Sequence, residues 1–404
     1  MSETGRRLTG GRCWMLALLL FSLPIPALAV LTIEVNKGVE AGIPIAVVPF
    51  GLQGLNELPQ APADIIESDL SLSGKFETIS RDLFLSRPTD LNSVKYKDWR
   101  LLKAEALVVG KVIQIGNGQL EVRFRLIDVF RERQIAGQKF IVPENRMRKV
   151  AHQISDIIYQ YLTGKPGAFD TKIAYVTVEG AASDRRFMLQ IADWDGFDPK
   201  TVLQSAEPIL SPAWSPDGNW LSYVSFEKKR SMIYVQNVWS GERKLVSEHQ
   251  GINSAPAWSP DGRQLALTLS KDGNPDIYLY NVNNSSLRRI TRHPAIDTEA
   301  SWSPDGRSLV FASGRAGAPQ IYEMSVAGGE PRRLTFNGKY NAGPSYSPDG
   351  KQIVMITDQG NGFRVGIYSN DDRNVRELTS TIQDESPTFA PNGEMIMYAT
   401  QRGG

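Results

Sequence analysis

Side chains suited to catalysis or metal binding are scarce in this 404-residue chain. It contains three histidines, His152, His249 and His293, and a single cysteine, Cys13. No two histidines have the spacing of metal ligands, and one cysteine can form neither a cysteine-rich zinc site nor an intramolecular disulfide. The sequence also has no G-x-S-x-G, H-E-x-x-H or GxxxxGK[ST] motif. We therefore expect surface or packing histidines, no cofactor, no metal and no enzymatic activity.

Aspartates recur within a five-residue phrase, and calcium binding is one chemistry that they suggest. The phrase is WSPDG, WSPDG, WSPDG, YSPDG and FAPNG, beginning at Trp214, Trp258, Trp302, Tyr346 and Phe389. Proline presets φ in a tight turn, aspartate can bond its own backbone, and glycine accepts a positive φ. We interpret the repeated aspartates as turn residues: Asp217, Asp261, Asp305 and Asp349.

The phrase returns every 43 or 44 residues, and each period can be divided into four short strands. In one period a strand ends at Trp302, residues 309–312 are an apolar strand, and residues 321–326 and 332–335 supply two more. Four antiparallel strands in a period of this length are typical of a β-propeller blade.

The second strands of the blades indicate how many blades there are. They begin near Ile173, Leu221, Leu265, Leu309, Ile353 and Ile396. We expect a six-bladed propeller over residues 170–404 whose first blade lacks its own inner strand and whose last blade is incomplete. This stretch is about 29 residues shorter than six periods require, so we expect the segment that closes the ring to be absent and a strand edge to be open.

The residues that enter each inner strand should surround one mouth of the central channel. They are Ile209, Leu210 and Ser211; Asn253, Ser254 and Ala255; Asp297, Thr298 and Glu299; Asn341, Ala342 and Gly343; and Asp384, Glu385 and Ser386. Asp297, Glu299, Asp384 and Glu385 would form an acidic arc suited to a partner that offers lysine or arginine. A rim that is merely solvated is the open alternative.

Residues 30–165 lack the repeat and predict a small α/β domain. Expected strands cover 43–50, 104–113, 119–128 and 134–142, and an expected helix covers 63–72. A longer amphipathic helix should be capped by Asn145 and stopped by Gly164, before a linker at 164–167.

The first 29 residues have the pattern of a signal peptide. Three arginines precede the stretch 14–23, which is apolar except for Ser22, and Ala27 and Ala29 are small residues of the kind that a signal peptidase reads. We expect cleavage after Ala29, export to the periplasm and no permanent membrane span. The 45 basic and 44 acidic residues give no field for nucleic acid, so we expect no such partner.

The segment directly after the cleavage site alternates like a strand. Leu31, Ile33 and Val35 alternate with polar residues, and glycines follow at 38 and 42. Such a free end can add itself to the sheet edge of another protein, or it can be an edge strand of its own domain.

The whole mature chain resembles the TolB family, the periplasmic component of the Tol–Pal system. The resemblance rests on the signal peptide, the two predicted domains, and the stretches VNKGVEAG and PIAVVPF at 35–50 and GAFDTKIAYV at 167–176. The chain departs from the family in ending before a further aromatic-Ser-Pro phrase.

The resemblance implies two partners and the residues that bind them. The segment after the signal peptide would bind TolA through Leu31, Ile33, Glu34, Val35, Asn36, Gly38 and Val39. The propeller mouth would bind the lipoprotein Pal, and Ala255, Thr298 and Glu299 match family positions implicated in that contact. Our full set for the mouth is Asn253, Ala255, Asp297, Thr298, Glu299, Asn341, Asp384 and Glu385.

We therefore expect a monomeric, non-enzymatic adaptor that supports outer-membrane integrity and constriction at division. In this family, Pal binding also changes whether the N-terminal segment is free for TolA. The alternative is a periplasmic propeller hydrolase, or a propeller that binds a sugar or a metal. A hydrolase would need a nucleophile–base pair or clustered carboxylates in the channel.

Overall fold

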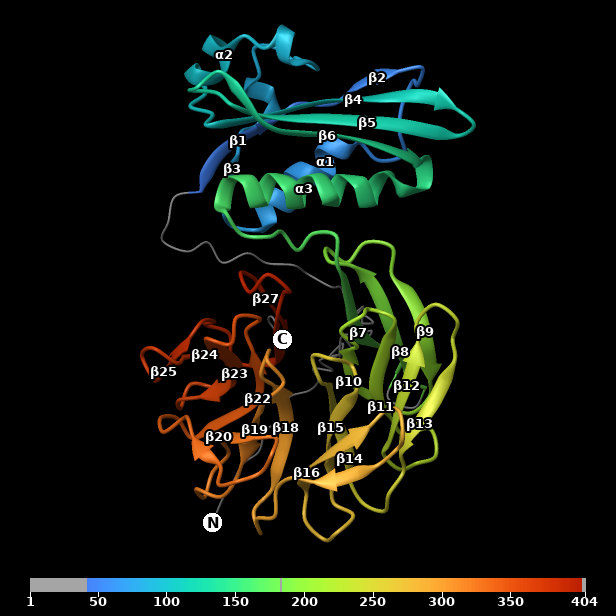
Figure 1. Ribbon diagram of the computed structural model, residues 1–404, viewed down its shortest axis with the longest axis vertical. Helices are drawn as coiled ribbons and strands as arrows, with labels where there is room; N and C mark the ends of the chain where they lie inside the picture. The colour runs from blue at the N-terminus through green and yellow to red at the C-terminus, as the bar shows by residue number, and fades with distance from the viewer. Residues whose placement is uncertain (1–41, 182–183, 402–404) are drawn as a thin grey trace, which may run out of the picture.

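The computed structural model describes residues 42–181 and 184–401, which form an α/β domain and a β-propeller (Figure 1). The predicted TolA-binding residues, Leu31 to Val39, lie outside the described residues, as does the expected cleavage site at Ala29. The α/β domain contains β1 (Ile43–Val47), β2 (Gly51–Gln53), α1 (Pro62–Leu72), β3 (Phe76–Thr78), α2 (Tyr96–Leu101), β4 (Ala106–Gly116), β5 (Gln119–Asp128), β6 (Arg133–Pro143) and α3 (Met147–Thr163).

The sheet of the α/β domain has the order β3-β1-β4-β5-β6, and β2 also pairs with β4. β1 runs parallel to both of its neighbours, whereas β4, β5 and β6 form an antiparallel meander. Helices α1 and α3 cover one face, where Ile66, Phe124 and Ile154 are buried in one core. The apolar residues that alternate along β5 face these helices, so the alternation reflects a sheet with one packed face, as predicted.

Helix α3 ends as predicted but begins differently. Gly164 is left-handed, with φ of 77°, and its N–H donates to the carbonyl of Gln160. The predicted cap at Asn145 is wrong because a 3₁₀ turn, Glu144–Arg146, precedes the helix and places Arg146 at the capping position.

The opposite face of the sheet is partly covered by α2 and the loops before it. Trp99 of α2 is fully buried, and its ring meets that of Phe84 edge-on at 5.0 Å between centroids. The sequence did not reveal this layer, because a helix of six residues is too short to show a period.

Four propeller blades contain all four expected antiparallel strands. The first two are β10 (Ile209–Trp214), β11 (Trp220–Ser225), β12 (Met232–Asn237) and β13 (Arg243–Ser247), then β14 (Asn253–Trp258), β15 (Gln264–Leu269), β16 (Asp276–Asn281) and β17 (Leu287–Arg289). The next two are β18 (Asp297–Trp302), β19 (Ser308–Ser313), β20 (Gln320–Ser325) and β21 (Arg332–Arg333), then β22 (Tyr340–Tyr346), β23 (Gln352–Asp358), β24 (Arg364–Ser369) and β25 (Asn374–Glu377).

The two ends of the propeller are smaller sheets. β7 (Lys172–Glu179), β8 (Arg186–Asp193) and β9 (Lys200–Ser205) form three strands without an inner strand, and β26 (Asp384–Phe389) pairs with β27 (Ile396–Thr400) alone. Within the described residues only five sheets therefore begin with an inner strand, so six complete blades are not present.

The repeated Ser-Pro-Asp-Gly phrase forms the predicted turn in each blade that has it. In one turn the hydroxyl of Ser303 donates to Asp305 at 2.6 Å and accepts the N–H of Ser308 at 2.9 Å. Hydrogen bonds from the serine hydroxyl and from the backbone lower the pKa of Asp305, and Asp217, Asp261 and Asp349 behave alike. The turn thus accounts for the repeated aspartates without a bound cation.

Strand direction separates the two faces of the propeller. Inner strands begin at one face, the mouth, and end in Ser-Pro-Asp-Gly turns at the other. The α/β domain contacts this other face, through the β8–β9 turn at Asp193 and the β26–β27 turn at Glu394. The predicted Pal site and the α/β domain therefore lie on opposite faces of the propeller.

Candidate functional site

The predicted mouth residues belong to the inner strands themselves, each of which contains a bulge at the same place. Ladder register shifts between Thr298 and Ser301, and between the equivalent residues of β10, β14, β22 and β26. One residue of each bulge is left-handed, with φ between 47° and 60°: Ser211, Ala255, Glu299, Gly343 and Ser386. Non-glycine residues rarely adopt this conformation, and its repetition at one site marks a functional candidate.

Half of the predicted contact residues are buried rather than presented at the mouth. Four residues at equivalent positions, at or next to the start of their inner strands, are at most 1% exposed: Asn253, Asp297, Asn341 and Asp384. Asp297 pairs with Arg315 through both carboxylate oxygens, at 2.8 and 3.0 Å. The expected acidic arc is therefore wrong for Asp297 and Asp384. Asp297 is buried against its own blade and Asp384 against the end of the preceding one, so a partner cannot reach either carboxylate.

The buried side chains of Asn253 and Asp384 hold the loops that surround the mouth. Asn253 accepts a hydrogen bond from Ser247 and donates to the carbonyl of His249. Asp384 accepts from the hydroxyls of Thr379 and Thr381. Each side chain ties the end of an outer strand to the next inner strand, so these residues position the mouth rather than contact a partner.

Glu299 is the most unusual side chain at the mouth. Its Oε2 accepts the backbone N–H of Gly343 at 2.9 Å, so the carboxylate reaches the equivalent bulge of the next blade. The Glu299 side chain is exposed to solvent at the mouth, yet desolvation by the neighbouring protein atoms raises the pKa of its carboxyl group, and the hydrogen bond from Gly343 only partly opposes this. Ala255 and Thr298 are half-buried beside it, and Glu385 is exposed.

Large apolar side chains around the mouth were missed by the sequence reasoning. Those exposed there are Ile252, Ile296, Phe336, Phe363 and Ile382, with Ile382 at 70%. A cavity of about 430 Å³ adjoins the second bulge and is lined by Leu210, Phe226 and Ile252 among others. The signal was present as Ile252 and Ile296, which stand 44 residues apart, but single apolar residues in loops are too common to be noticed.

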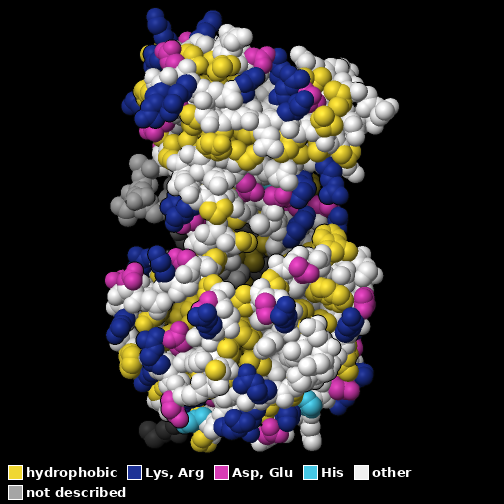
Figure 2. Space-filling view, in the orientation of Figure 1, with side chains coloured by type: hydrophobic (Ala, Val, Ile, Leu, Met, Phe, Trp, Pro, Cys, Tyr) yellow, Lys and Arg dark blue, Asp and Glu magenta, His cyan; other side chains and the backbone are white. Residues whose placement is uncertain are grey.

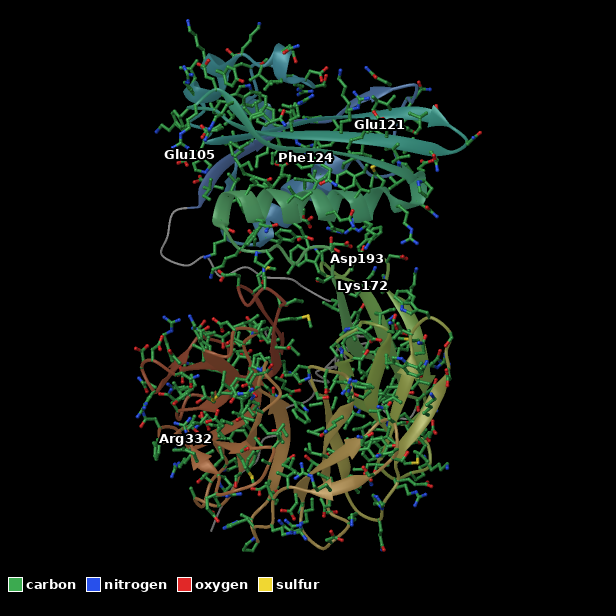
Figure 3. All side chains as sticks on the ribbon, viewed as in Figure 1. Glu105, Glu121, Phe124, Lys172, Asp193 and Arg332 are labelled. Carbon is green, nitrogen blue, oxygen red and sulfur yellow. The ribbon has the colours of Figure 1, made fainter. Side chains whose placement is uncertain are left out.

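A second polar cluster joins the two domains, and charged side chains of both signs are visible at this waist in Figure 2. Asp69 of α1 is fully buried and binds His152 of α3 at 2.8 Å and the indole N–H of Trp194 at 3.0 Å. Figure 3 labels Lys172 and Asp193, which pair beside it. His152, predicted as a surface or packing residue, is 2% exposed and packs between the domains.

Arg148 of α3 completes this junction. Its guanidinium bonds Asp193 at 2.8 Å and pairs with Asp195, and it lies 3.9 Å from the ring centroid of Phe197. Burial would raise the pKa of Asp193, but hydrogen bonds from Lys172 and Arg148 outweigh burial and lower it. Asp193 is therefore an anion held by cations of the junction.

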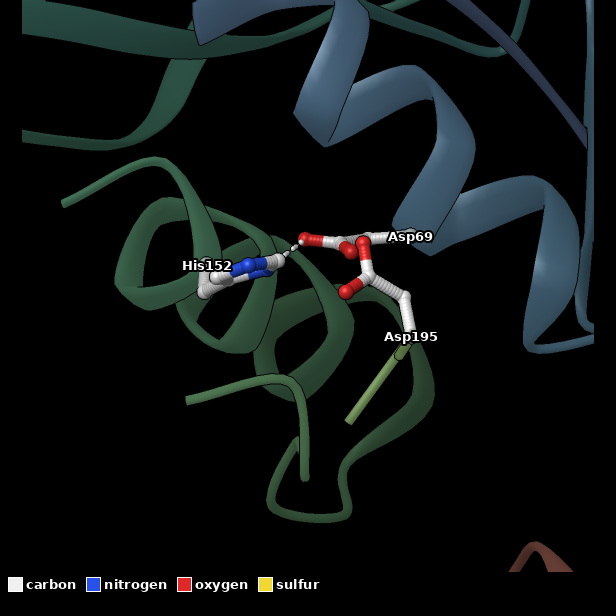
Figure 4. A group of neighbouring side chains, drawn as sticks. All are labelled: Asp69, His152 and Asp195. Atoms are coloured by element: carbon white, nitrogen blue, oxygen red, sulfur yellow. Dashed lines mark hydrogen bonds and ion pairs between the residues drawn. The ribbon is translucent and has the colours of Figure 1, made fainter. Parts of the chain in front are cut away.

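Asp69, His152 and Asp195 place ligand atoms within 4.8 Å of one another, the spacing of a cation site (Figure 4). Both oxygens of Asp69 already accept hydrogen bonds, and Arg148 already pairs with Asp195. An added cation would displace these partners, so the donor set fits a domain junction better than a metal site.

An α/β domain followed by a propeller of Ser-Pro-Asp-Gly blades defines a two-domain β-propeller protein. A family model described as the TolB beta propeller domain matches residues 159–404, and one described as the TolB amino-terminal domain matches 31–135. The chain belongs to the TolB family.

Individual relatives agree with this assignment. The Tol-Pal system protein TolB of Nitrosococcus oceani is 60% identical over 388 residues, which cover 96% of this chain and 89% of that protein. That of Methylobacillus flagellatus is 59% identical over 375 residues, covering 93% and 86%. The crystal structure of TolB from Acinetobacter baumannii superposes with a TM-score of 0.84 at 41% identity, covering 92% of this chain and 91% of that one.

We predict that Asp297→Ala lowers the free energy of unfolding by about 3 kcal/mol, because it leaves Arg315 without its buried counter-charge. Urea unfolding followed by circular dichroism measures this loss. Glu385→Ala is the control, because Glu385 is an exposed acidic residue near the start of the inner strand β26. This variant should change the free energy of unfolding by less than about 0.5 kcal/mol. Equal effects of the two variants would show that Asp297 has no special structural role.

We predict that Glu299→Gln is more stable than the parent protein at neutral pH, with an advantage that shrinks as pH falls. The raised pKa means that the folded protein binds the proton more tightly than the unfolded chain, so ionisation of Glu299 opposes folding above about pH 4.5. Thermal unfolding of both proteins between about pH 4 and 7 tests this. A constant difference across that range would contradict it.

Proposed function

We propose that this chain is a periplasmic adaptor of the Tol–Pal system that breaks no bonds and links two envelope proteins. Family membership and the relatives named Tol-Pal system protein TolB support this proposal. Among the residues that the structure describes, no helix combines the length and apolarity needed to cross a membrane. Export, cleavage after Ala29, a monomeric state and a role in outer-membrane integrity and division belong to the same proposal.

The mouth of the propeller is the proposed binding site for Pal. The observation that carries this is the row of five left-handed bulges, which lines one opening with Ala255, Thr298 and Glu299 from adjacent blades. The exposed apolar side chains around it would supply the desolvated contacts on which protein interfaces depend. Glu299 and Glu385 would add a charged contact for a basic group on Pal.

The N-terminal segment, Leu31 to Gly42, is the proposed binding site for TolA. The described chain begins at Gly42, beside β3: a side chain there would lie 2.8 Å from the carbonyl carbon of Phe76. The N–H of Ile43 then donates to the carbonyl of Lys75. The segment would therefore leave the domain from an anchored position at the start of β1, beside the edge strand β3.

The ring itself is proposed to have six blades, with the α/β domain covering residues 30–165 and the propeller 170–404. The three strands β7–β9 and the two strands β26–β27 would be parts of blades at the two ends of the repeat. Both parts contact the α/β domain, since Arg148 binds the first, whereas Lys165 and Lys75 bind Glu394 of the last.

We predict that Glu299→Arg weakens Pal binding at least tenfold in isothermal titration calorimetry of the mature protein with soluble Pal. The change reverses a charge where the mouth meets its partner and breaks the contact with Gly343. Glu330→Arg is the matched control, because Glu330 is exposed in a loop at the face opposite the mouth. Unaltered Pal binding by a folded Glu299→Arg protein would reject the mouth as the contact.

We predict that removal of residues 31–41 abolishes TolA binding and leaves Pal affinity and thermal stability unchanged. The deletion stops before Gly42, so the contact between β1 and β3 is kept. Binding of the two partners and the unfolding temperature are measured on the same preparation. TolA binding that survives the deletion would place the TolA site elsewhere on the protein.

A further inference from the structure

The outer face of the α/β sheet, away from the propeller, is unusually cationic. On β5, Leu120, Val122, Phe124 and Leu126 belong to the core under the helices, so the residues between them face the other way. Figure 3 labels one residue of each kind, Phe124 and Glu121. The propeller contacts α1 and α3, which cover the other face of the sheet. The outer face therefore points away from the junction between the two domains.

Three cations on this face stand directly opposite one another on neighbouring strands. Lys111 of β4 pairs with Arg123 of β5, and Arg123 pairs with Lys139 of β6. Arg125, two residues along β5, adds a fourth charge and is exposed. Like charges in opposite positions on neighbouring strands destabilise a sheet, so anionic groups placed against this row of cations would stabilise it.

The anions within the chain only partly meet this need. Glu121 pairs with both Arg123 and Lys139, and Asp90 pairs with Lys111. Arg125 binds the neutral side chain of Gln134. Four cations thus face two carboxylates, although the whole chain is almost balanced in charge. Figure 2 shows Lys and Arg side chains over this domain, at the top of the view.

Large apolar side chains stand exposed beside the cationic row. Ile141 follows Lys139 on the same face of β6 and is 52% exposed. Leu101, at the end of α2, is 74% exposed, and Phe130, in the β5–β6 turn, is 59% exposed. These two lie at one end of the face, because Arg100 of α2 pairs with Glu132 of that turn.

We propose that this face docks on an anionic phospholipid surface, with the lysines and arginines at the headgroups and Leu101, Phe130 and Ile141 at the acyl boundary. Cations spread over three strands, about 4.8 Å apart, suit a planar array of charges. Protruding apolar side chains among cations are the combination that holds proteins at lipid interfaces. An acidic protein segment would be held by the charges alone and would leave the apolar side chains unused.

Co-sedimentation of the mature protein with vesicles tests the proposal. Vesicles of phosphatidylglycerol and phosphatidylethanolamine should bind the protein at low salt, and vesicles of phosphatidylcholine should not. The double variant Arg123→Gln/Lys139→Gln should bind at least tenfold more weakly. Arg376→Glu, an exposed charge change on the outer propeller strand β25 that likewise lowers the net charge by two, should bind like the parent.

Several results would overturn the proposal. They are failure of the parent protein to bind anionic vesicles, equal binding by the folded double variant, and binding by Arg376→Glu as weak as that of the double variant. Leu101→Ser/Phe130→Ser should lose vesicle binding, because it removes the side chains placed at the acyl boundary. If the parent protein binds soluble polyglutamate but not anionic vesicles, the occupant is an acidic protein segment instead.

Discussion

Each of the four complete propeller blades depends on one serine hydroxyl that serves two hydrogen bonds. In the turn after β18 it donates to the aspartate two residues on and accepts the backbone N–H five residues on. These two bonds close the turn and set where β19 begins to pair with β18. The same geometry returns in four blades, and the inner strand of each contains a left-handed bulge at the equivalent place.

The bulges in turn divide the mouth residues into two kinds. Polar residues near the start of the inner strands are buried: Asp297 binds Arg315 of its own blade, whereas Asn253 and Asp384 bind the end of the preceding blade and the loop after it. The residue at the bulge is turned toward the channel, where Glu299 reaches the next blade. A partner at the mouth would thus meet a surface built from several blades at once, with buried polar side chains holding its shape.

The junction between the domains is equally specific. Asp69, His152 and Arg148 meet the β8–β9 turn, and Lys165 and Lys75 meet Glu394 of the β26–β27 turn. The α/β domain therefore contacts the first and the last sheets of the propeller at once. Separating the partners of a buried ion pair destabilises the protein. The relative position of these two sheets is therefore coupled to the position of α3 against them.

Elements that repeat or alternate could be predicted from the sequence alone. The period of 44 predicted the blades, the alternation on β5 predicted a sheet with one packed face, and Gly164 predicted the end of α3, because each of these is a local property of the chain. Only the tertiary structure decided that Asp297 is buried against Arg315, that His152 meets an aspartate 83 residues away, and that five bulges share one channel. Such contacts join residues far apart in sequence, and whether a polar side chain faces solvent, its own blade or another domain depends on packing that no local pattern records.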